Sequence, residues 1–387
     1  MPDTSVSTPP DPHPRLRRLQ AGVEALLIRL RPYLWVWPPI AFGAGVLSFF
    51  LVDRQQWLGG LLALGMLLAW VLLLGEGLIG RLLARRGYPT LPQGITAFIA
   101  QLIHQETLFF CLPFLLATTV WTSGQALFTL LLIGLGLLSI IDPLYYRLAG
   151  RLRWLYFAFH AQCVFVVVLV TLPLLLSLTT AESLGYALLA MVVFALPSLI
   201  HLLHPKGWRS WLALLGVALL LAGAAWSGRA WVPTAHLRLT GSALAPELDR
   251  DSRTPVGELD LTPEALAREG LYAYTAIRAP RGLEETIYHE WHHQGELLDR
   301  IPLTVHGGRE AGYRAWSHKL NFPETSSGDW RIDIVTSSGQ RLGSLRFDVS
   351  AAAPQRADGE IHVLQGIPGL EWRRMLPGMP RSHGETG

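Results

Sequence analysis

Cysteine is scarce in this chain of 387 residues, which contains only Cys111 and Cys163. Both lie in apolar stretches, so a disulfide framework is not expected and both thiols should behave as small buried hydrophobic groups. Lysine is equally rare, with Lys206 and Lys319 the only two among 32 basic residues. This preference for arginine would suit a bacterium with a GC-rich genome.

The chain also lacks the common motifs of nucleotide binding, hydrolysis and thiol redox chemistry. It has no G-x-x-x-x-G-K-S/T loop, no G-x-G-x-x-G after a strand, no G-x-S-x-G and no paired C-x-x-C. Its formal net charge of +3 is small and the charges are segregated, which argues against a nucleic-acid partner. We therefore expect no cofactor, no bound metal and no nucleic acid, and no catalytic activity is evident.

Apolar sequence, by contrast, is abundant: hydrophobic residues make up 50% of the chain and its mean hydropathy is +0.32. Seven stretches approach the ~20 apolar residues that cross the hydrocarbon core of a bilayer. The third stretch begins near 94, or alternatively near Leu108, because its first part contains several polar residues. We predict transmembrane helices over 34–52, 57–80, 94–121, 125–141, 154–178, 182–203 and 210–227.

Basic residues in the short loops alternate from one side of the predicted bundle to the other. Thirteen arginines and lysines lie before the first span or in the loops after the second, fourth and sixth spans, whereas the remaining loops contain Arg54 alone. Cytoplasmic loops of membrane proteins carry an excess of arginine and lysine. We therefore predict a bacterial inner-membrane protein with a cytoplasmic N-terminus. Seven spans would then put the C-terminal domain in the periplasm.

Beyond the last span, the sequence changes to short runs in which apolar and polar residues alternate between glycine- and proline-rich turns. The clearest run, 330–335, puts Trp330, Ile332 and Ile334 on one face and forms a hairpin with 345–349. Turn signals this frequent favour an antiparallel β-sandwich, for which an immunoglobulin-like topology is one option. Further strands are predicted at 271–277, 286–293, 297–306 and 313–318.

The predicted fold is thus an all-α membrane bundle followed by an all-β sandwich. A short helix at 262–268 would be capped by Thr262 and begin at Pro263. The predicted parts are a disordered cytoplasmic N-terminus (1–30), a seven-span bundle (31–228), a linker with the short helix (229–268), a periplasmic sandwich (269–350) and a loose tail (351–387).

Several landmarks of the C-terminal part resemble a known family. They are Ile287-Tyr-His-Glu-Trp-His-His-Gln-Gly295, Ile301-Pro-Leu-Thr-Val305, Tyr313-Arg-Ala-Trp-Ser-His-Lys319, Gly328-Asp-Trp-Arg-Ile-Asp-Ile334, Gly339 and Phe347. Over residues 270–350 this pattern is similar to the bacterial domain of unknown function 2914, and the membrane half resembles family 5924. Both families are uncharacterised, so the resemblance implies no activity.

The segment from His289 to His293 matches the H-E-x-x-H pattern, which binds zinc in metalloproteases when it lies on a helix. The surrounding β-branched and aromatic residues instead predict a strand. In a strand the two histidines would stand ~13 Å apart and Glu290 would face the opposite way. We therefore favour a structural strand. A metal site assembled across strands, with His306 or His318, is the remaining alternative.

Polar residues inside transmembrane spans are costly and are default candidates for function. One interpretation is a pocket for a proton, a small ligand, a lipid headgroup or a metal, with His104, Glu106 and His160 at its centre. The other is structural: interfacial positions, interhelical hydrogen bonds and a helix stop at Asp142. The residues predicted near the cytoplasmic leaflet are Glu76, Gln101, His104, Gln105, Glu106, Asp142, His160, Gln162, His201 and His204.

Two functions therefore remain open from the sequence. The first is a non-enzymatic membrane protein that displays its sandwich to bind an envelope protein or a cell-wall polymer, with Trp291, Tyr313 and Trp316 as the contact surface. The second is a transporter, a sensor or a lipid-modifying protein that acts through the intramembrane polar residues.

Overall fold

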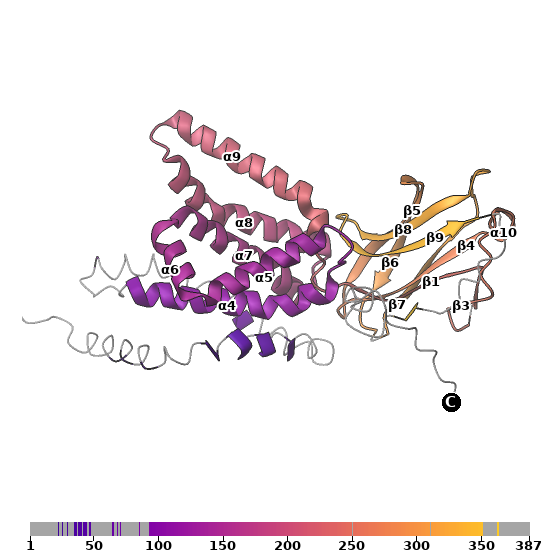
Figure 1. Cartoon of the computed structure of the whole chain (residues 1–387), viewed down its shortest axis with the longest axis horizontal. Coiled ribbons are helices and arrows are strands. Elements are labelled where there is room, and N and C mark those ends of the chain that lie inside the picture. The colour runs from indigo at the N-terminus through magenta and orange to yellow at the C-terminus, as the bar shows by residue number, and fades with distance from the viewer. Residues whose placement is uncertain are drawn as a thin grey trace, which may run out of the picture.

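The computed structural model describes residues 93–249, 251–309 and 311–350, with isolated positions before residue 93 and the pair 362–363. Helices fill one half of this structure and strands the other, and the two halves lie end to end (Figure 1). Apart from those isolated positions, the predicted spans 34–52 and 57–80, the N-terminal segment and the tail lie outside the described residues.

Six helices form the described part of the bundle. Its core includes Leu115, Leu132 and Val166, none of which has exposed surface. Cys111 and Cys163 are free thiols buried in the same core, as predicted. The helices are α4 (Gln93–Thr118), α5 (Gln125–Ile140), α6 (Asp142–Arg151), α7 (Arg153–Leu176), α8 (Thr180–Leu203) and α9 (Trp208–Ser227), followed by the 3₁₀ turn η2 (Gly228–Trp231).

Four segments are long and apolar enough to cross a membrane, which indicates a membrane protein: Ala97–Thr118, Arg153–Leu176, Thr180–Leu203 and Trp208–Trp231. The predicted span 125–141 differs. α5 has 16 residues, a length of about 24 Å that is shorter than the ~30 Å hydrocarbon core. α6 follows it at an angle of 94°, so the pair is a fifth span only if the bent helices are counted as one. By length and composition, the described residues thus contain four or five candidate spans, and seven are not established.

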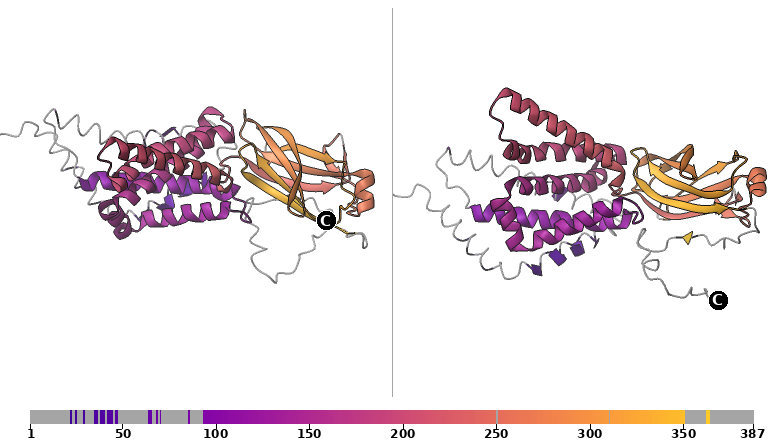
Figure 2. Two further views of the ribbon diagram at one scale, coloured as in Figure 1. Left: turned by 90° about the horizontal axis from the view of Figure 1, so that it is seen from above. Right: turned by 45° about the horizontal axis from the view of Figure 1, so that its top comes forward.

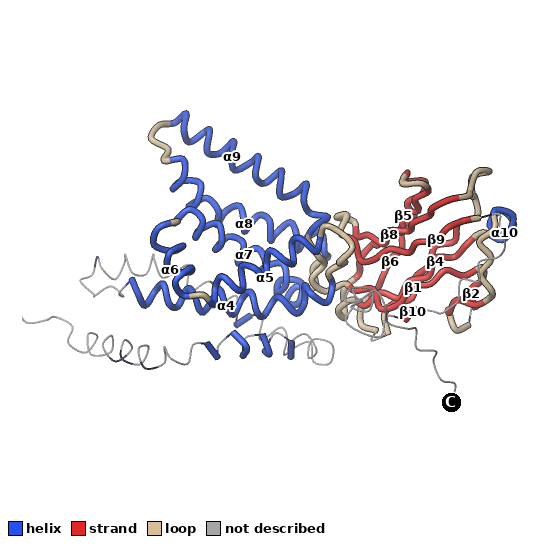
Figure 3. The backbone as a smooth tube through the Cα atoms, in the orientation of Figure 1, coloured by secondary structure: helices blue, strands red, loops and turns tan. Residues whose placement is uncertain are grey.

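The ends of the helices agree with two further details of the sequence analysis. α4 is continuous from Gln93, so the third predicted helix begins near 94 and not near Leu108. The connections that carry Arg151, Arg153 and Lys206 lie at the end of the bundle away from the sandwich (Figures 1 and 3). The basic residues in these two loops are therefore gathered on one side.

Two four-stranded antiparallel sheets make up the second half, stacked as a sandwich (Figure 2). The first sheet has the order β10-β1-β4-β7, the second has the order β6-β5-β8-β9, and β2 and β3 form a separate hairpin. The strands are β1 (Arg238–Ala245), β2 (Glu247–Asp249), β3 (Thr254–Val256), β4 (Leu271–Arg278), β5 (Glu284–His293), β6 (Glu296–His306), β7 (Tyr313–Lys319), β8 (Gly328–Thr336), β9 (Arg341–Val349) and β10 (His362–Val363).

Every predicted strand is present, and the antiparallel sandwich is confirmed. Trp330, Ile332 and Ile334 share the inward face of β8 and are at most 1% exposed, as their alternation predicted. The short helix is also confirmed as α10 (Pro263–Glu269), and the Thr262 hydroxyl accepts a hydrogen bond from the Ala265 N–H at 3.3 Å.

The segment predicted as a linker, 229–268, contains three strands in addition to α10. Its strand β1 pairs with β4, so the sandwich begins at β1 and not at residue 269. Leu237 and Leu239 enter the core beneath the sheet. The strand was missed because Gly241 and Ala243 occupy its other face, and small residues have weak strand preference.

A short segment after η2 joins the two hydrophobic cores. Val232 and Ala235 belong to the core of the bundle, whereas Leu237 belongs to the core of the sandwich. Trp231 packs against the turn before α5, where a Cβ atom added to Gly124 would lie 2.7 Å from its ring. The sandwich is therefore seated on the bundle by packing and is not held by a tether alone.

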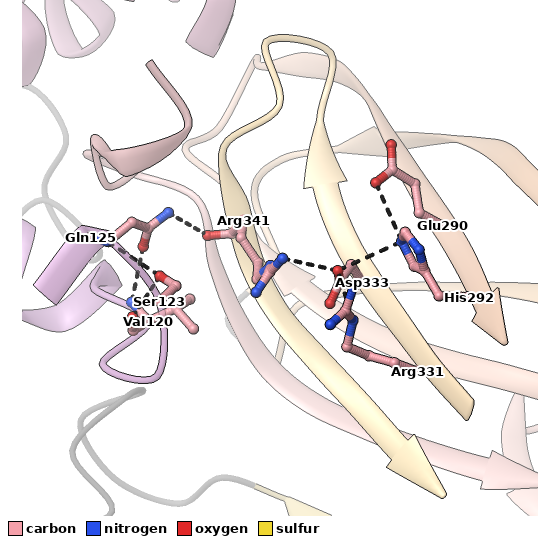
Figure 4. Close-up of polar contacts among 8 residues, drawn as sticks. All are labelled: Val120, Ser123, Gln125, Glu290, His292, Arg331, Asp333 and Arg341. Carbon is pink, nitrogen blue, oxygen red and sulfur yellow. Dashed lines mark hydrogen bonds and ion pairs between the residues drawn. The ribbon is translucent and has the colours of Figure 1, made fainter. Parts of the chain in front are cut away.

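Hydrogen bonds cross the same junction. Three side-chain donors reach backbone carbonyls at 2.9 Å, and Figure 4 shows the first of them: Gln125 to Arg341, Arg229 to Ser338 and Gln340 to Val232. Glu285 on β5 accepts two hydrogen bonds from Thr180, the first residue of α8. These bonds connect α5, α8 and η2 to the second sheet.

Candidate functional site

A chain of three hydrogen-bonded side chains lies inside the bundle and joins α4, α6 and α7. His104, on α4, has no exposed surface. Its Nδ1 lies 2.9 Å from the Tyr145 hydroxyl on α6, and its Nε2 lies 2.9 Å from Nδ1 of His160 on α7. The fold therefore brings together two of the three residues predicted for the centre of this site, and adds Tyr145.

Aromatic rings enclose the two histidines. The Trp70 ring centroid lies 5.6 Å from that of His104 and 4.8 Å from that of His160, and the Phe159 centroid lies 4.9 Å from that of His104. Trp70 Nε1 donates to Thr107 Oγ1 at 2.8 Å. A signal for Trp70 existed in the sequence, because tryptophan is enriched at membrane interfaces and this one occurs in the middle of a predicted span.

The predicted glutamines stabilise the break between α5 and α6. Gln101 Nε2 donates to the Ser139 carbonyl at 3.0 Å and to Asp142 Oδ1 at 2.8 Å, and Gln105 Nε2 donates to the same carbonyl at 2.7 Å. The last carbonyls of a helix have no partner within it, and lipid cannot supply one. Pro143 follows in the first turn of α6, as expected for a helix stop. These contacts support the structural interpretation for Gln101, Gln105 and Asp142.

Other predicted intramembrane residues that the structure describes do not join the site. Glu106 is half-buried, and no hydrogen bond or ion pair links its carboxyl group to His104 or His160 in the described part of the chain. His201 is exposed near the end of α8. Glu76 lies outside the described residues.

The chemistry of this site is therefore that of a short hydrogen-bonded path. A phenol and an imidazole can each donate and accept, so Tyr145, His104 and His160 could relay or hold a proton. Among the residues that the structure describes, no group of three or more His, Cys, Asp or Glu side chains is placed to hold a metal ion.

In the sandwich, the H-E-x-x-H segment is a strand, as predicted, and its first histidine is a core residue. His289 Nδ1 lies 2.9 Å from Ser317 Oγ and its Nε2 lies 3.1 Å from Thr275 Oγ1. The Thr275 hydroxyl donates to the Ala315 carbonyl at 3.2 Å, so it accepts from the Nε2–H of a neutral His289. Burial lowers the pKa of His289 to about 4. Its hydrogen bonds are complete without a metal.

The three aromatic residues predicted as a contact surface occupy different positions. Trp291 has no exposed surface and lies between the sheets, so it belongs to the core and not to a contact surface. The alternation of β5 puts it on the inward face with His289. Tyr313 packs half-buried against a second core cluster of the sandwich, which contains Ile277 and Val305, whereas Trp316 lies half-buried on the outward face of β7.

Trp316 belongs to a row of aromatic side chains on the outward face of the first sheet, here called the aromatic strip: Tyr272, Tyr274, Trp316 and His318. Trp316 pairs with Tyr274, and His318 pairs with Tyr272, across β4 and β7. Directly paired residues share one face of a sheet. The Tyr272 and His318 rings are stacked with centroids 3.7 Å apart. The two tyrosines could have been found from their spacing of two residues within a predicted strand.

The outward face of the second sheet carries a charged network instead (Figure 4). Asp333 is 2% exposed, and its Oδ2 lies 2.9 Å from an Arg341 nitrogen and 3.1 Å from Arg331 Nε. His292 stands between Asp333, at 3.7 Å, and Glu290, at 3.9 Å. Glu290 and Asp333 are direct cross-strand partners that would repel each other, so the arginines stabilise this face.

Comparison with known families divides the chain within the sandwich, and not at the junction between the bundle and the sandwich. Residues 16–273 match a family of unknown function, DUF5924, and residues 284–349 match a protein of unknown function, DUF2914. No curated protein and no solved structure matches the chain. The first match ends within β4 and the second begins at β5, so each covers only part of the sandwich. Since the first match spans well over half of its residues, the chain belongs to the family of unknown function DUF5924, and its second sheet lies in a region that matches DUF2914.

Proposed function

We propose that this protein is a non-enzymatic bacterial inner-membrane protein whose bundle holds the β-sandwich on the periplasmic side, where the aromatic strip binds an envelope polymer or protein. The strip carries the proposal. Tyr272, Trp316 and His318 keep part of their surface exposed on this outward sheet face, beside the buried Tyr274, and provide an amphipathic surface of the kind that sugars and peptide side chains pack against.

The seating of the sandwich supports this function. A binding module on a tether could sample many orientations, whereas here packing at Val232 and Trp231 and the hydrogen bonds of Gln125 and Gln340 fix its orientation toward the bundle. The strip would then face a constant direction relative to the membrane. The entropic cost of binding is lower when the binding surface is already held in place before its ligand arrives.

Cysteine reporters can test both the side of the membrane on which the sandwich lies and the binding of a ligand at the aromatic strip. The native Cys111 and Cys163 are buried and should not react. We would place single cysteines by Leu320→Cys beside the strip, Asp348→Cys on the opposite sheet and Lys206→Cys at the other end of the bundle, all exposed positions. In cells with a permeabilised outer membrane, an impermeant maleimide should label the first two and not the third. Leu320→Cys should react severalfold more slowly in cells than in the purified protein.

The matched comparison is Asp348→Cys, which should react at the same rate in both settings. Adding Trp316→Ala to Leu320→Cys should abolish the difference between cells and purified protein. In the cells with a permeabilised outer membrane, labelling of Lys206→Cys without labelling of the sandwich would refute the orientation. Equal rates at Leu320→Cys in the two settings would refute binding at the strip.

A second candidate function, proton transfer or sensing within the bundle, is favoured by one observation. His104 is fully buried in a predicted membrane span and hydrogen-bonded through both ring nitrogens. An ionisable side chain at such a place is costly and is a default candidate for function.

Substitution separates this role from a structural one. His104→Asn and Gln101→Asn should each lower bundle stability by about 1–3 kcal/mol, the usual cost of leaving a buried hydrogen-bonding group unpaired. In a strain with a deletion phenotype, His104→Asn should fail to complement at normal protein level, whereas Gln101→Asn should complement. Full complementation by His104→Asn would leave only the structural role.

A further inference from the structure

A cleft of about 370 Å³ lies where the α7–α8 connection meets the second sheet. Thr179, the capping residue of α8, forms one wall, and residues of β5 and of the β8–β9 turn form the others. Under the proposed orientation, this cleft lies at the outer surface of the bilayer. The described residues that line it are Thr179, Glu284, Glu285, Thr286, Tyr288 and Ser337.

The lining is rich in hydrogen-bond acceptors and carries negative charge. It consists of two carboxylates and four hydroxyls, and none of the six side chains is basic. Glu284 has a titratable neighbour, His306, whose Nδ1 lies 3.7 Å from its carboxylate, but both side chains are more than half exposed. Exposed pairs of this kind contribute little.

Glu285 is the least exposed residue of the lining, at 3%. Its Oε2 accepts hydrogen bonds from the Thr180 backbone N–H at 3.0 Å and from the Thr180 hydroxyl at 2.6 Å. Its Oε1 is buried without a hydrogen-bond partner among the described residues. Thr179 cannot supply one, because its N–H and hydroxyl both donate to Glu182, at 2.9 and 2.7 Å.

The unpartnered oxygen needs a donor from outside the described chain. Burial, and then the nearby charge of Glu182, raise the pKa of Glu285, whereas the bonds from Thr180 oppose this. Protonation would not solve the problem, since a protonated Oε1 would need an acceptor instead. A buried carboxylate oxygen without a donor is costly, and a cationic donor is its natural complement.

We propose that this cleft binds a primary ammonium group, supplied by the ethanolamine headgroup of a lipid or by a small soluble amine. An ammonium group has three donors, which suit a carboxylate surrounded by hydroxyls. A quaternary ammonium has none. A divalent metal fits less well, because the described residues contain no group of three His, Cys, Asp or Glu placed to hold one. The proposal is independent of the role of the aromatic strip.

The test uses the purified full-length protein in nanodiscs of phosphatidylcholine, with ethanolamine or choline added to identical samples. Ethanolamine should raise the unfolding temperature in a saturable manner, and choline should not. In nanodiscs that also contain phosphatidylethanolamine, native mass spectrometry should find that lipid preferentially retained. Glu285→Gln should remove whichever response occurs.

Because Glu285→Gln could weaken the contact with α8, Glu284→Gln serves as a second variant that leaves the Thr180 bonds in place, and it should weaken the response severalfold. Glu264→Gln, on the exposed surface of α10, is the control and should change nothing. If phosphatidylethanolamine is retained but free ethanolamine has no effect, the ligand is a lipid headgroup. If free ethanolamine raises the unfolding temperature, the ligand is a soluble amine. The proposal is overturned if neither occurs, if choline acts equally, or if both cleft variants respond like the unchanged protein.

Discussion

A fragment of residues 284–349, the region that matches DUF2914, is expected not to fold, whereas residues 232–350 should fold as a stable sandwich. The shorter fragment retains the whole second sheet but loses β1 and β4, the central strands of the first. Trp291, Trp330 and Ile332 would then face water. Each such side chain contributes about 1.5–3 kcal/mol when buried, and a domain has only about 5–15 kcal/mol of total stability.

Circular dichroism, tryptophan fluorescence and the dispersion of amide NMR signals would show which of the two fragments folds. The longer fragment should show cooperative unfolding and a blue-shifted emission from its buried tryptophans. The shorter fragment should show neither. Cooperative unfolding of 284–349 alone would contradict the view that one sandwich core is shared between the regions matched by the two families.

The sandwich is also expected to lose stability in mild acid, and His289 should be the main cause. Burial lowers the pKa of this histidine from 6.5 to about 4. The unfolded chain therefore binds a proton below pH 6.5 that the folded chain refuses until about pH 4. The contribution of neutral His289 to the free energy of unfolding is fully present above pH 6.5. It is lost as the pH falls toward 4, by about 1.4 kcal/mol per pH unit and by a total on the order of 3 kcal/mol.

Chemical denaturation of residues 232–350 at several pH values between 7 and 4 would measure this loss. His289→Gln should lower stability at pH 7, because it disturbs the bonds to Ser317 and Thr275, but should flatten the pH dependence. His306→Gln is the matched control, since that histidine is exposed and its removal should leave the slope unchanged. An unaltered slope in His289→Gln would show that another group causes the acid sensitivity.

Local sequence patterns predicted much of this fold correctly. Alternation identified β4 to β9, because a half-buried strand places apolar side chains at every second residue. The same alternation excluded the zinc motif, since it put Glu290 and His289 on opposite faces of β5. Thr262 and Pro263 marked the start of α10 correctly, because capping depends only on residues within the first turn.

Local patterns failed where tertiary contacts override them. β1 carries Gly241 and Ala243, and it is a strand because β4 lies beside it. Trp291 looked like a contact residue, but the register of β5 placed it between the sheets. The sequence also did not show that the predicted span 125–141 turns at Ile141 into α6, so that it is a span only if the two bent helices are counted as one.

The candidate site within the bundle shows the same limit. The sequence identified His104 and His160 as costly intramembrane residues, but spacing along one helix cannot show which residues of other helices they meet. Packing of α4 against α6 and α7 selected Tyr145 as a partner and left Glu106 outside.

The sequence alone therefore determined what depends on composition and short-range periodicity: an apolar helical half and a strand-rich half. Only the tertiary structure decided which polar groups pair, where the sandwich begins and how it is seated on the bundle. The physical reason is that a hydrogen bond requires its two atoms to lie about 3 Å apart. For residues far apart in the chain, such as Glu285 and Thr180, that distance is set by packing and not by sequence spacing.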